Sequence, residues 1–149
     1  MAPPRAISVQ RVVHSTAARI FDVLADPARH ASIDGSGHVD APAASHARLA
    51  LGSTFSMHMS IGLPYVTKNR VVEFEEGRRI AWHHFARFIW RYELEPRGDD
   101  TLVTETFDYS APWGVLIVPT GWPQRNRTSM ERTLATLDEL LSDAPQEPQ

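Results

Sequence analysis

The chain has 149 residues, of which 42% are hydrophobic and 9% aromatic, so it can bury one core and form a single domain over residues 1–149. Fifteen Lys and Arg against eighteen Asp and Glu give a formal charge of -3, which is too weak to indicate a nucleic-acid or anionic-membrane partner. The absence of cysteine excludes disulfides, thiolate metal sites and cysteine nucleophiles. Residues 1–6 precede no apolar run of a signal peptide, and no stretch of about 20 apolar residues follows. We therefore expect a cytoplasmic protein with no integral membrane segment.

The first third of the chain predicts one strand and two short helices. Residues 5–14 alternate and are rich in Val and Ile, which is typical of a strand. Ser15 or Thr16 can cap a helix whose apolar stripe is Ile20, Phe21, Val23 and Leu24. The Asp-Pro pair at 26–27 is typical of a new helix start and predicts a second short helix over 27–33. Asp34-Gly35-Ser36-Gly37 then breaks the chain.

The rest of the chain predicts an antiparallel meander followed by one long helix. Residues 38–109 are divided into strand-like segments by turn signals such as Glu76-Gly77-Arg78 and the run at 97–100. From 123 to 142, apolar residues recur at helical spacing, which predicts an amphipathic helix with one buried face formed by Met130, Leu134, Leu137 and Leu141. We expect residues 5–142 to be ordered and 143–149 to be a frayed tail.

These elements predict an α+β domain of about seven antiparallel strands, whose apolar face the last helix covers. Four segments in this order resemble the helix-grip proteins of the START and Bet v 1 type, specifically the polyketide cyclase/dehydrase-like or SRPBCC branch. They are Ile-Phe-Asp-Val-Leu-Ala-Asp-Pro at 20–27, Gly-Arg-Arg-Ile-Ala-Trp at 77–82, Trp-Arg-Tyr-Glu-Leu at 90–94 and Thr-Leu-Val-Thr-Glu-Thr at 101–106. The resemblance covers nearly the whole chain and implies a curved sheet wrapped around the C-terminal helix, with a cavity for a hydrophobic small molecule.

Strand parity and turn length predict which side chains share the inner face of the sheet. If Pro96 faces Thr101 across the turn at 97–100, the next inner pairs are Leu94 with Val103, Tyr92 with Glu105, and Trp90 with Phe107. A loop centred near Arg87 then places Trp82 beside Tyr92 and His84 beside Trp90. A turn centred on Gly77 places Val72 beside Trp82 and Arg70 beside His84.

The predicted inner face combines apolar walls with a few ionisable groups, which is typical of a small-molecule pocket. A closed core would not be expected to hold Arg70, His84, Tyr92 and Glu105 together, because buried ionisable groups are costly unless paired. Plain core packing of the apolar residues stays open as the alternative. Near Glu105, aromatic rings should raise the carboxyl pKa and Arg70 or a protonated His84 should lower it, so its direction is open. The residues that we expect to line the cavity are Met57, Met59, Arg70, Val72, Trp82, His84, Trp90, Tyr92, Glu105, Phe107, Met130 and Leu134.

Several kinds of catalytic or cofactor site lack their motifs. His83 and His84 are adjacent on a strand and point to opposite faces, and no metal-ligand spacing occurs on a helix, so we expect no metal site. Gly35-Ser36-Gly37 lacks the context of a dinucleotide loop, so no cofactor is implied, and no nucleophile elbow indicates a hydrolase. His84, Glu105 and Tyr92 remain as candidate acid-base groups for enolisation, dehydration or aldol cyclisation.

Three hypotheses for function remain open. The first is the binding or carriage of a hydrophobic small molecule, such as a lipid, a polyketide or an aromatic compound. The second is a cofactor-independent polyketide cyclase or dehydratase that uses general acid-base catalysis, and whether the protein is an enzyme stays uncertain. The third is a protein-interaction module with a vestigial cavity, in which the apolar segment 113–119 or a sheet edge docks another protein or a second copy to form a homodimer.

Overall fold

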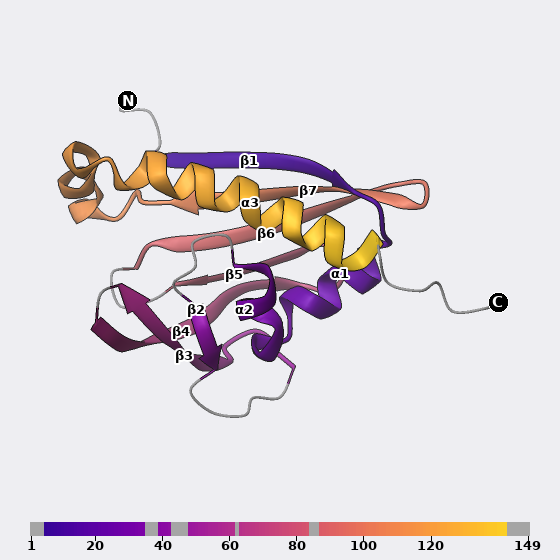
Figure 1. Ribbon diagram of the computed structural model, residues 1–149, viewed down its shortest axis with the longest axis horizontal. Coiled ribbons are helices and arrows are strands. Elements are labelled where there is room, and N and C mark those ends of the chain that lie inside the picture. The colour runs from indigo at the N-terminus through magenta and orange to yellow at the C-terminus, as the bar shows by residue number, and fades with distance from the viewer. Residues whose placement is uncertain (1–4, 35–38, 43–47, 62, 84–86, 143–149) are drawn as a thin grey trace.

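A computed structural model describes residues 5–34, 39–42, 48–61, 63–83 and 87–142 (Figure 1). Strands and helices follow the predicted order. In chain order the elements are β1 (Ala6–Val13), α1 (Ala17–Leu24), η1 (Pro27–Arg29), α2 (His30–Ile33), β2 (Val39–Pro42), β3 (Thr54–Ile61), β4 (Leu63–Glu75), β5 (Arg79–His83), β6 (Ile89–Arg97), β7 (Asp100–Asp108), η2 (Pro112–Thr120) and α3 (Trp122–Ser142). The predicted tail at 143–149 lies outside the described residues.

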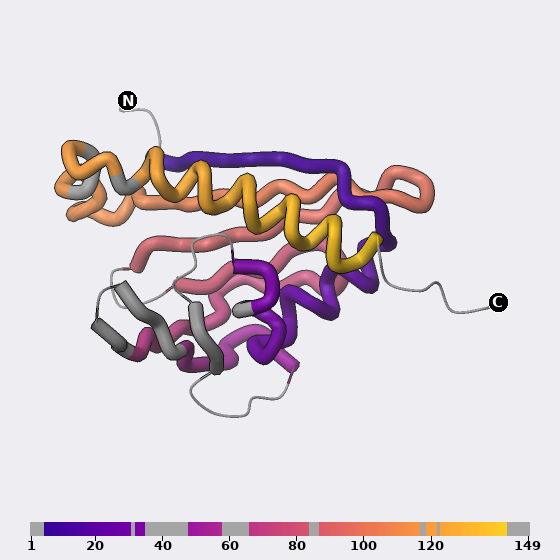
Figure 2. Tube along the Cα trace, in the orientation of Figure 1, coloured from indigo at the N-terminus to yellow at the C-terminus, as the bar shows by residue number. Residues whose placement is uncertain are grey.

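All seven strands form one antiparallel sheet in the order β1-β7-β6-β5-β4-β3-β2. The chain runs through a meander from β2 to β7, and β7 then pairs with β1, so the first and last strands lie side by side. The trace in Figure 2 shows that α3, from the other end of the chain, runs along β1. This is the helix-grip architecture that the sequence predicts.

The helices cover one face of the sheet and bury their apolar stripes against it. The predicted inner residues of α3 are all buried: Met130, Leu134, Leu137 and Leu141. Helix α1 begins at the predicted cap Thr16, whose side chain accepts a hydrogen bond from the Arg19 backbone N–H. The Asp26 side chain likewise caps η1, with Pro27 in the first helical position. Helix α3 packs against β1 and β7.

The predicted register is correct for one hairpin and wrong for two. Between β6 and β7, Pro96 opposes Thr101, Tyr92 opposes Glu105, and Trp90 opposes Phe107, as expected. Between β5 and β6, Trp82 opposes Trp90 rather than Tyr92, because the loop is centred one residue earlier than predicted. That error moves the pairing by two residues and leaves Trp82 on the inner face.

A β-bulge in β4 has a larger consequence. Phe74 opposes Ile80, as a turn centred on Gly77 requires, but Val71 rather than Val72 opposes Trp82. The extra residue at Val72 reverses the side-chain parity for the part of β4 that precedes it. Val71 is therefore buried, whereas Arg70 opposes His83 and is exposed. The predicted inward placement of Arg70 and the predicted pairing of Val72 are wrong for this reason.

Candidate functional site

The centre of the inner face is a buried pair formed by Tyr92 on β6 and Glu105 on β7. Their side chains are on the same face because the two residues are directly opposed in the hairpin. The Tyr92 hydroxyl donates a hydrogen bond of 2.8 Å to Oε1 of Glu105. Relative exposure is 6% for Tyr92 and 2% for Glu105, so the hydrogen bond between them is shielded from bulk water.

Glu105 has only half of its carboxyl group satisfied. Oε2 is buried and has no hydrogen-bond partner among the described residues. Burial raises the pKa of Glu105 to about 8, the hydrogen bond from Tyr92 opposes the rise, and the nearby charge of Asp34 adds to it. The acid is therefore mostly protonated at neutral pH. Since a protonated carboxyl carries one O–H, Glu105 can donate a hydrogen bond from the oxygen that lacks a partner.

The exposed position of Arg70 settles the direction that the sequence left open. With Arg70 on the other side of the sheet, no cation among the described residues lowers the pKa of Glu105. His84, the other predicted counter-charge, lies outside the described residues. Burial consequently dominates, and it favours the neutral acid.

A cluster of rings adjoins the Tyr92 side of this pair. Trp82 lies 5.7 Å from Tyr92 between ring centroids, and the His30 imidazole stacks on Trp82 at 5.1 Å. Phe55 meets both Trp82 and His30 edge to face. On the other side, the Trp90 and Phe107 rings lie 4.6 Å apart. Aromatic walls of this kind suit a flat or apolar ligand.

His30 is a functional candidate that the sequence analysis did not identify. It is buried, and its Nε2 lies 2.9 Å from the carbonyl oxygen of Leu24. Burial lowers the pKa of His30, and the hydrogen bond to Leu24 and the charge of Asp26 oppose that shift. The imidazole is therefore neutral at pH 7, with its hydrogen on Nε2, because a carbonyl can only accept. Nδ1 then carries a lone pair and can act as an acceptor or a base.

Asp34 is the second functional candidate that the sequence analysis did not identify, because the sequence around it indicates only a break in the chain. It caps the end of α2 through its backbone N–H, which donates to the carbonyl oxygen of His30. Its charge raises the pKa of both Glu105 and Tyr92. His30 and Asp34 are four residues apart around one short helix, which was the available sequence signal that both belong to one site.

Most of the predicted lining residues are on the inner face. Six are buried: Met57, Tyr92, Glu105, Phe107, Met130 and Leu134. Trp82 and Trp90 are half-buried although they point inward. Val72 is half-buried at the bulge, and Arg70 is exposed. His84 and the side chain of Met59 lie outside what the structure describes. The role of these residues in ligand binding stays a prediction.

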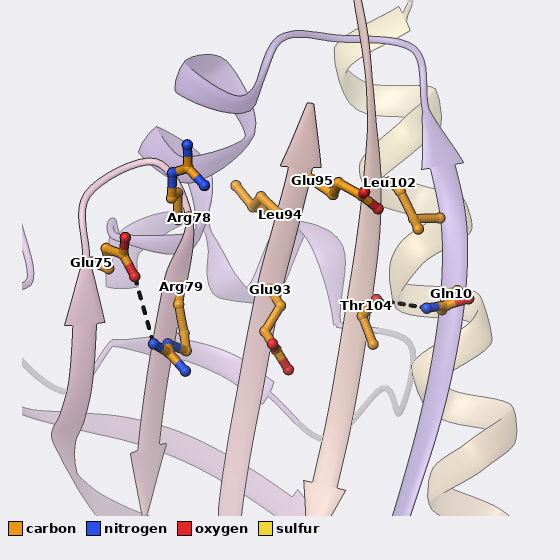
Figure 3. A pocket seen from close by; sticks show the side chains of 9 residues that line it. All are labelled: Gln10, Glu75, Arg78, Arg79, Glu93, Leu94, Glu95, Leu102 and Thr104. Carbon is orange, nitrogen blue, oxygen red and sulfur yellow. Dashed lines mark hydrogen bonds and ion pairs between the residues drawn. The ribbon is translucent and has the colours of Figure 1, made fainter. Parts of the chain in front are cut away.

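Two further features concern other kinds of site. Within the described part of the chain, no group of three or more His, Asp or Glu could hold a metal ion. A depression of about 340 Å³ lies over β1 and β4–β7, lined mainly by polar residues (Figure 3). Its charges are mixed, and Arg79 pairs with Glu75 at 3.5 Å. This depression lacks the aromatic walls of the Tyr92–Glu105 site.

Comparison with solved structures shows the same fold in distant proteins. An AHSA1-like protein from Aeromonas hydrophila superposes with a TM-score of 0.73 at 13% identity, covering 97% of this chain and 99% of that one. The Aha1 dimer from Colwellia psychrerythraea superposes with a TM-score of 0.69 at 14% identity, covering 93% of this chain and 96% of that one. At these identities the likeness establishes the fold.

Sequence relatives and a family model place the chain more narrowly. An uncharacterised protein of Mycobacterium tuberculosis strain H37Rv is 37% identical over 145 residues, covering 93% of this chain and 65% of the relative. The chain thus spans about two thirds of that relative's length. None of the described helices is long and apolar enough to cross a membrane. The model of the family described as polyketide cyclase / dehydrase and lipid transport matches residues 4–142, so this chain belongs to that family.

Proposed function

We propose that the protein binds a hydrophobic small molecule between its sheet and α3, and that Glu105 and Tyr92 recognise one oxygen of that ligand. The observation that carries the proposal is the Oε2 atom of Glu105, which is buried without a partner among the described residues. Leaving such an atom unsatisfied costs about 1–3 kcal/mol. A ligand oxygen that accepts its hydrogen would recover that free energy.

The protonation state of Glu105 restricts the ligand class. A neutral acid donates to a carbonyl, ether or hydroxyl oxygen, and it gives no charge attraction to an amine. An anionic headgroup would be repelled by Asp34, whose charge already reaches Glu105. The favoured ligand is therefore a neutral lipid, polyketide or aromatic compound with a carbonyl or hydroxyl group.

The aromatic walls support the apolar part of this proposal. Trp82 and Trp90 point inward, pack against the core and remain half-buried, so part of each ring is accessible. Their remaining accessible surface is available to a ligand that lies against them. The family description, which names lipid transport beside cyclase and dehydrase activity, is consistent with such a ligand.

A second candidate function, proton-transfer catalysis, is favoured by the same carboxyl. An acid with a pKa near 8 can protonate a carbonyl oxygen at neutral pH, and a neutral His30 can accept a proton. Enolisation, dehydration and cyclisation need only such transfers, and these are the reactions of a cyclase or dehydratase. Turnover of a polyketide-type ketone by the wild-type protein, lost in Glu105→Gln, would establish this function over simple binding.

The binding proposal is tested with a matched pair of probes, fluorenone and fluorene, which differ by one carbonyl oxygen. Quenching of tryptophan fluorescence reports binding at Trp82 and Trp90. We expect the wild-type protein to prefer fluorenone by about tenfold, which is the effect of about 1.4 kcal/mol. Glu105→Leu should remove this preference because it removes the donor. Glu93→Leu, on the same hairpin but exposed, serves as the control and should keep it.

The pH dependence of the preference for fluorenone over fluorene provides a second, independent test. Wild-type preference for fluorenone should fall above pH 8, where Glu105 loses its proton, whereas Glu105→Gln should retain a donor at every pH. Failure of fluorenone, fluorene, fatty acids and sterols alike to bind would contradict the whole proposal. Equal preference in wild type and Glu105→Leu would contradict the assigned role of Glu105 alone.

A further inference from the structure

The segment η2, which joins β7 to α3, exposes an unusual concentration of large apolar side chains. Trp113 is 39% exposed, Val115 54% and Leu116 71%. Other large exposed apolar residues, such as Leu51 and Val66, are in separate elements. In Figure 1, η2 projects at the end of the molecule where α3 begins. We call Trp113, Val115 and Leu116 the η2 patch.

Hydrogen bonds and close packing fix the backbone of η2, so the exposure of the η2 patch follows from the fold. The Arg5 guanidinium donates to the carbonyl oxygens of Tyr109 and Ala111, at 3.2 and 3.1 Å. Gly114 is buried so closely against the carbonyl of Tyr109 that a Cβ atom would clash with it. At the other end of the segment, the Arg125 side chain donates to the carbonyl oxygen of Thr120 at 3.1 Å.

Between the bounding acidic residues Asp108 and Glu131, the segment that carries the patch has only positive charges, although the chain as a whole carries -3. Residues 109–130 include no Asp or Glu, whereas Arg125 and Arg127 are in the first turns of α3. Both arginines are exposed. Among the described residues, neither they nor Arg5 form an ion pair with a carboxylate. A partner that is both apolar and anionic would complement this apolar patch and the arginines that follow it.

We propose that the η2 patch docks the protein on the surface of an anionic membrane. Leu116 and Val115 would enter the boundary between headgroups and acyl chains, and Trp113 would lie at headgroup level, where tryptophan is favoured. Arg125 and Arg127 would contact the anionic headgroups, each strengthening binding about fivefold near such a surface. This mode of binding is peripheral and needs no spanning helix.

Charge favours a membrane over a second copy of this chain. In a two-fold dimer through the patch, the same surface faces itself, so the arginines of one copy would approach those of the other. A lipid surface supplies the opposite charge and the apolar layer together. The inference is independent of the ligand proposed above, because it uses none of the residues of the Tyr92–Glu105 site.

Flotation with lipid vesicles tests the inference. We expect binding to vesicles with about 30 mol% phosphatidylglycerol in phosphatidylcholine, binding about tenfold weaker to phosphatidylcholine alone, and release by about 0.5 M salt. Leu116→Ser should weaken binding about tenfold, because it removes the most exposed apolar side chain of the patch. Leu51→Ser is the control, since Leu51 is 67% exposed and lies in the turn before β3, outside the η2 patch.

A second pair of variants tests the charge. Arg125→Gln/Arg127→Gln should weaken binding to the anionic vesicles about thirtyfold, whereas Arg19→Gln/Arg78→Gln, with the same change in charge elsewhere, should not. Binding that is absent, or equally affected by the control variants, would overturn the proposal. So would a dimer in solution that Leu116→Ser dissociates, since that result assigns the patch to a second copy.

Discussion

Replacing Glu105 by glutamine should abolish a loss of stability that the wild-type protein undergoes as the pH rises. In the folded protein the pKa of Glu105 is raised from 4.5 to about 8, whereas the unfolded chain ionises this group at its ordinary value. Between those two pH values the folded state binds the extra proton. The free energy of unfolding must therefore fall as pH rises through this range, and the fall ends once the pH exceeds the folded pKa.

The magnitude follows from the size of the pKa difference. At about 1.4 kcal/mol per pKa unit, the full loss is about 5 kcal/mol, of which about 2 kcal/mol falls between pH 6.5 and pH 8.5. Between pH 6.5 and pH 8.5, the ionisation of Glu105 is expected to dominate the pH dependence of stability. Burial lowers the pKa of His30 below 6.5, so its contribution has the opposite sign, and only about 0.4 kcal/mol of it remains to be gained above pH 6.5. Glu105→Gln shares that small gain, so it cancels in the comparison with wild type. Tyr92 does not interfere, because burial and Glu105 raise its pKa well above 10.0.

Urea denaturation of wild type, Glu105→Gln and Glu93→Gln at several pH values between 6.5 and 8.5 measures the effect. Wild type and the exposed-site control Glu93→Gln should each lose about 2 kcal/mol across the range, and Glu105→Gln should be nearly flat. Parallel pH curves for wild type and Glu105→Gln would refute the raised pKa. The neutral-donor argument for ligand recognition would then be withdrawn with it.

Two further predictions concern the packing of α3 and η2. Burial alone would raise the pKa of Asp138, but hydrogen bonds from His14, Ser142 and Arg11 lower it to about 2. The free energy of unfolding of wild type should therefore fall by about 2 kcal/mol as the pH falls from 3.8 towards 2. Asp138→Asn should not show this fall when its stability is measured by acid titration. Gly114→Ala should destabilise the fold by about 1–3 kcal/mol, because its Cβ atom would meet the Tyr109 carbonyl; an unchanged urea midpoint would contradict this.

The sequence predicted local structure well wherever a short signal determines it. Thr16 and Asp26 cap the expected helices, and α3 buries the expected face. The β6–β7 register was correct because the tight turn at 97–100 leaves one pairing that keeps apolar residues inward. The bulge at Val72 was not predicted, because the local sequence carries no glycine or other signal for an extra residue.

The same contrast, between what short local signals determine and what they do not, explains which site residues could be predicted. Tyr92 and Glu105 were paired correctly because one hairpin determines their positions. His30 and Asp34 are on a four-residue helix, and their proximity to that hairpin depends on how the helix packs across the sheet. The pattern of hydrophobic residues along the chain does not indicate how this helix packs across the sheet. The misplacement of Arg70, which followed from the bulge, was one of the two reasons, with the predicted His84, why the direction of the Glu105 pKa shift was left open.

Glu105 and Asp138, the two buried carboxyl groups among the described residues, differ in their hydrogen bonding and in the direction of their pKa shifts. Asp138 accepts hydrogen bonds from β1, α3 and the residue after β1, and its pKa is lowered to about 2. It stabilises the contact between first strand and last helix. Glu105 keeps one oxygen without a described partner, and its pKa is raised to about 8, so its ionisation opposes folding. An apolar residue such as its inner-face neighbour Val103 would avoid that cost. A side chain that lowers stability in the free protein is best explained by an interaction that the free protein lacks, which is why we assign Glu105, and not Asp138, to the ligand.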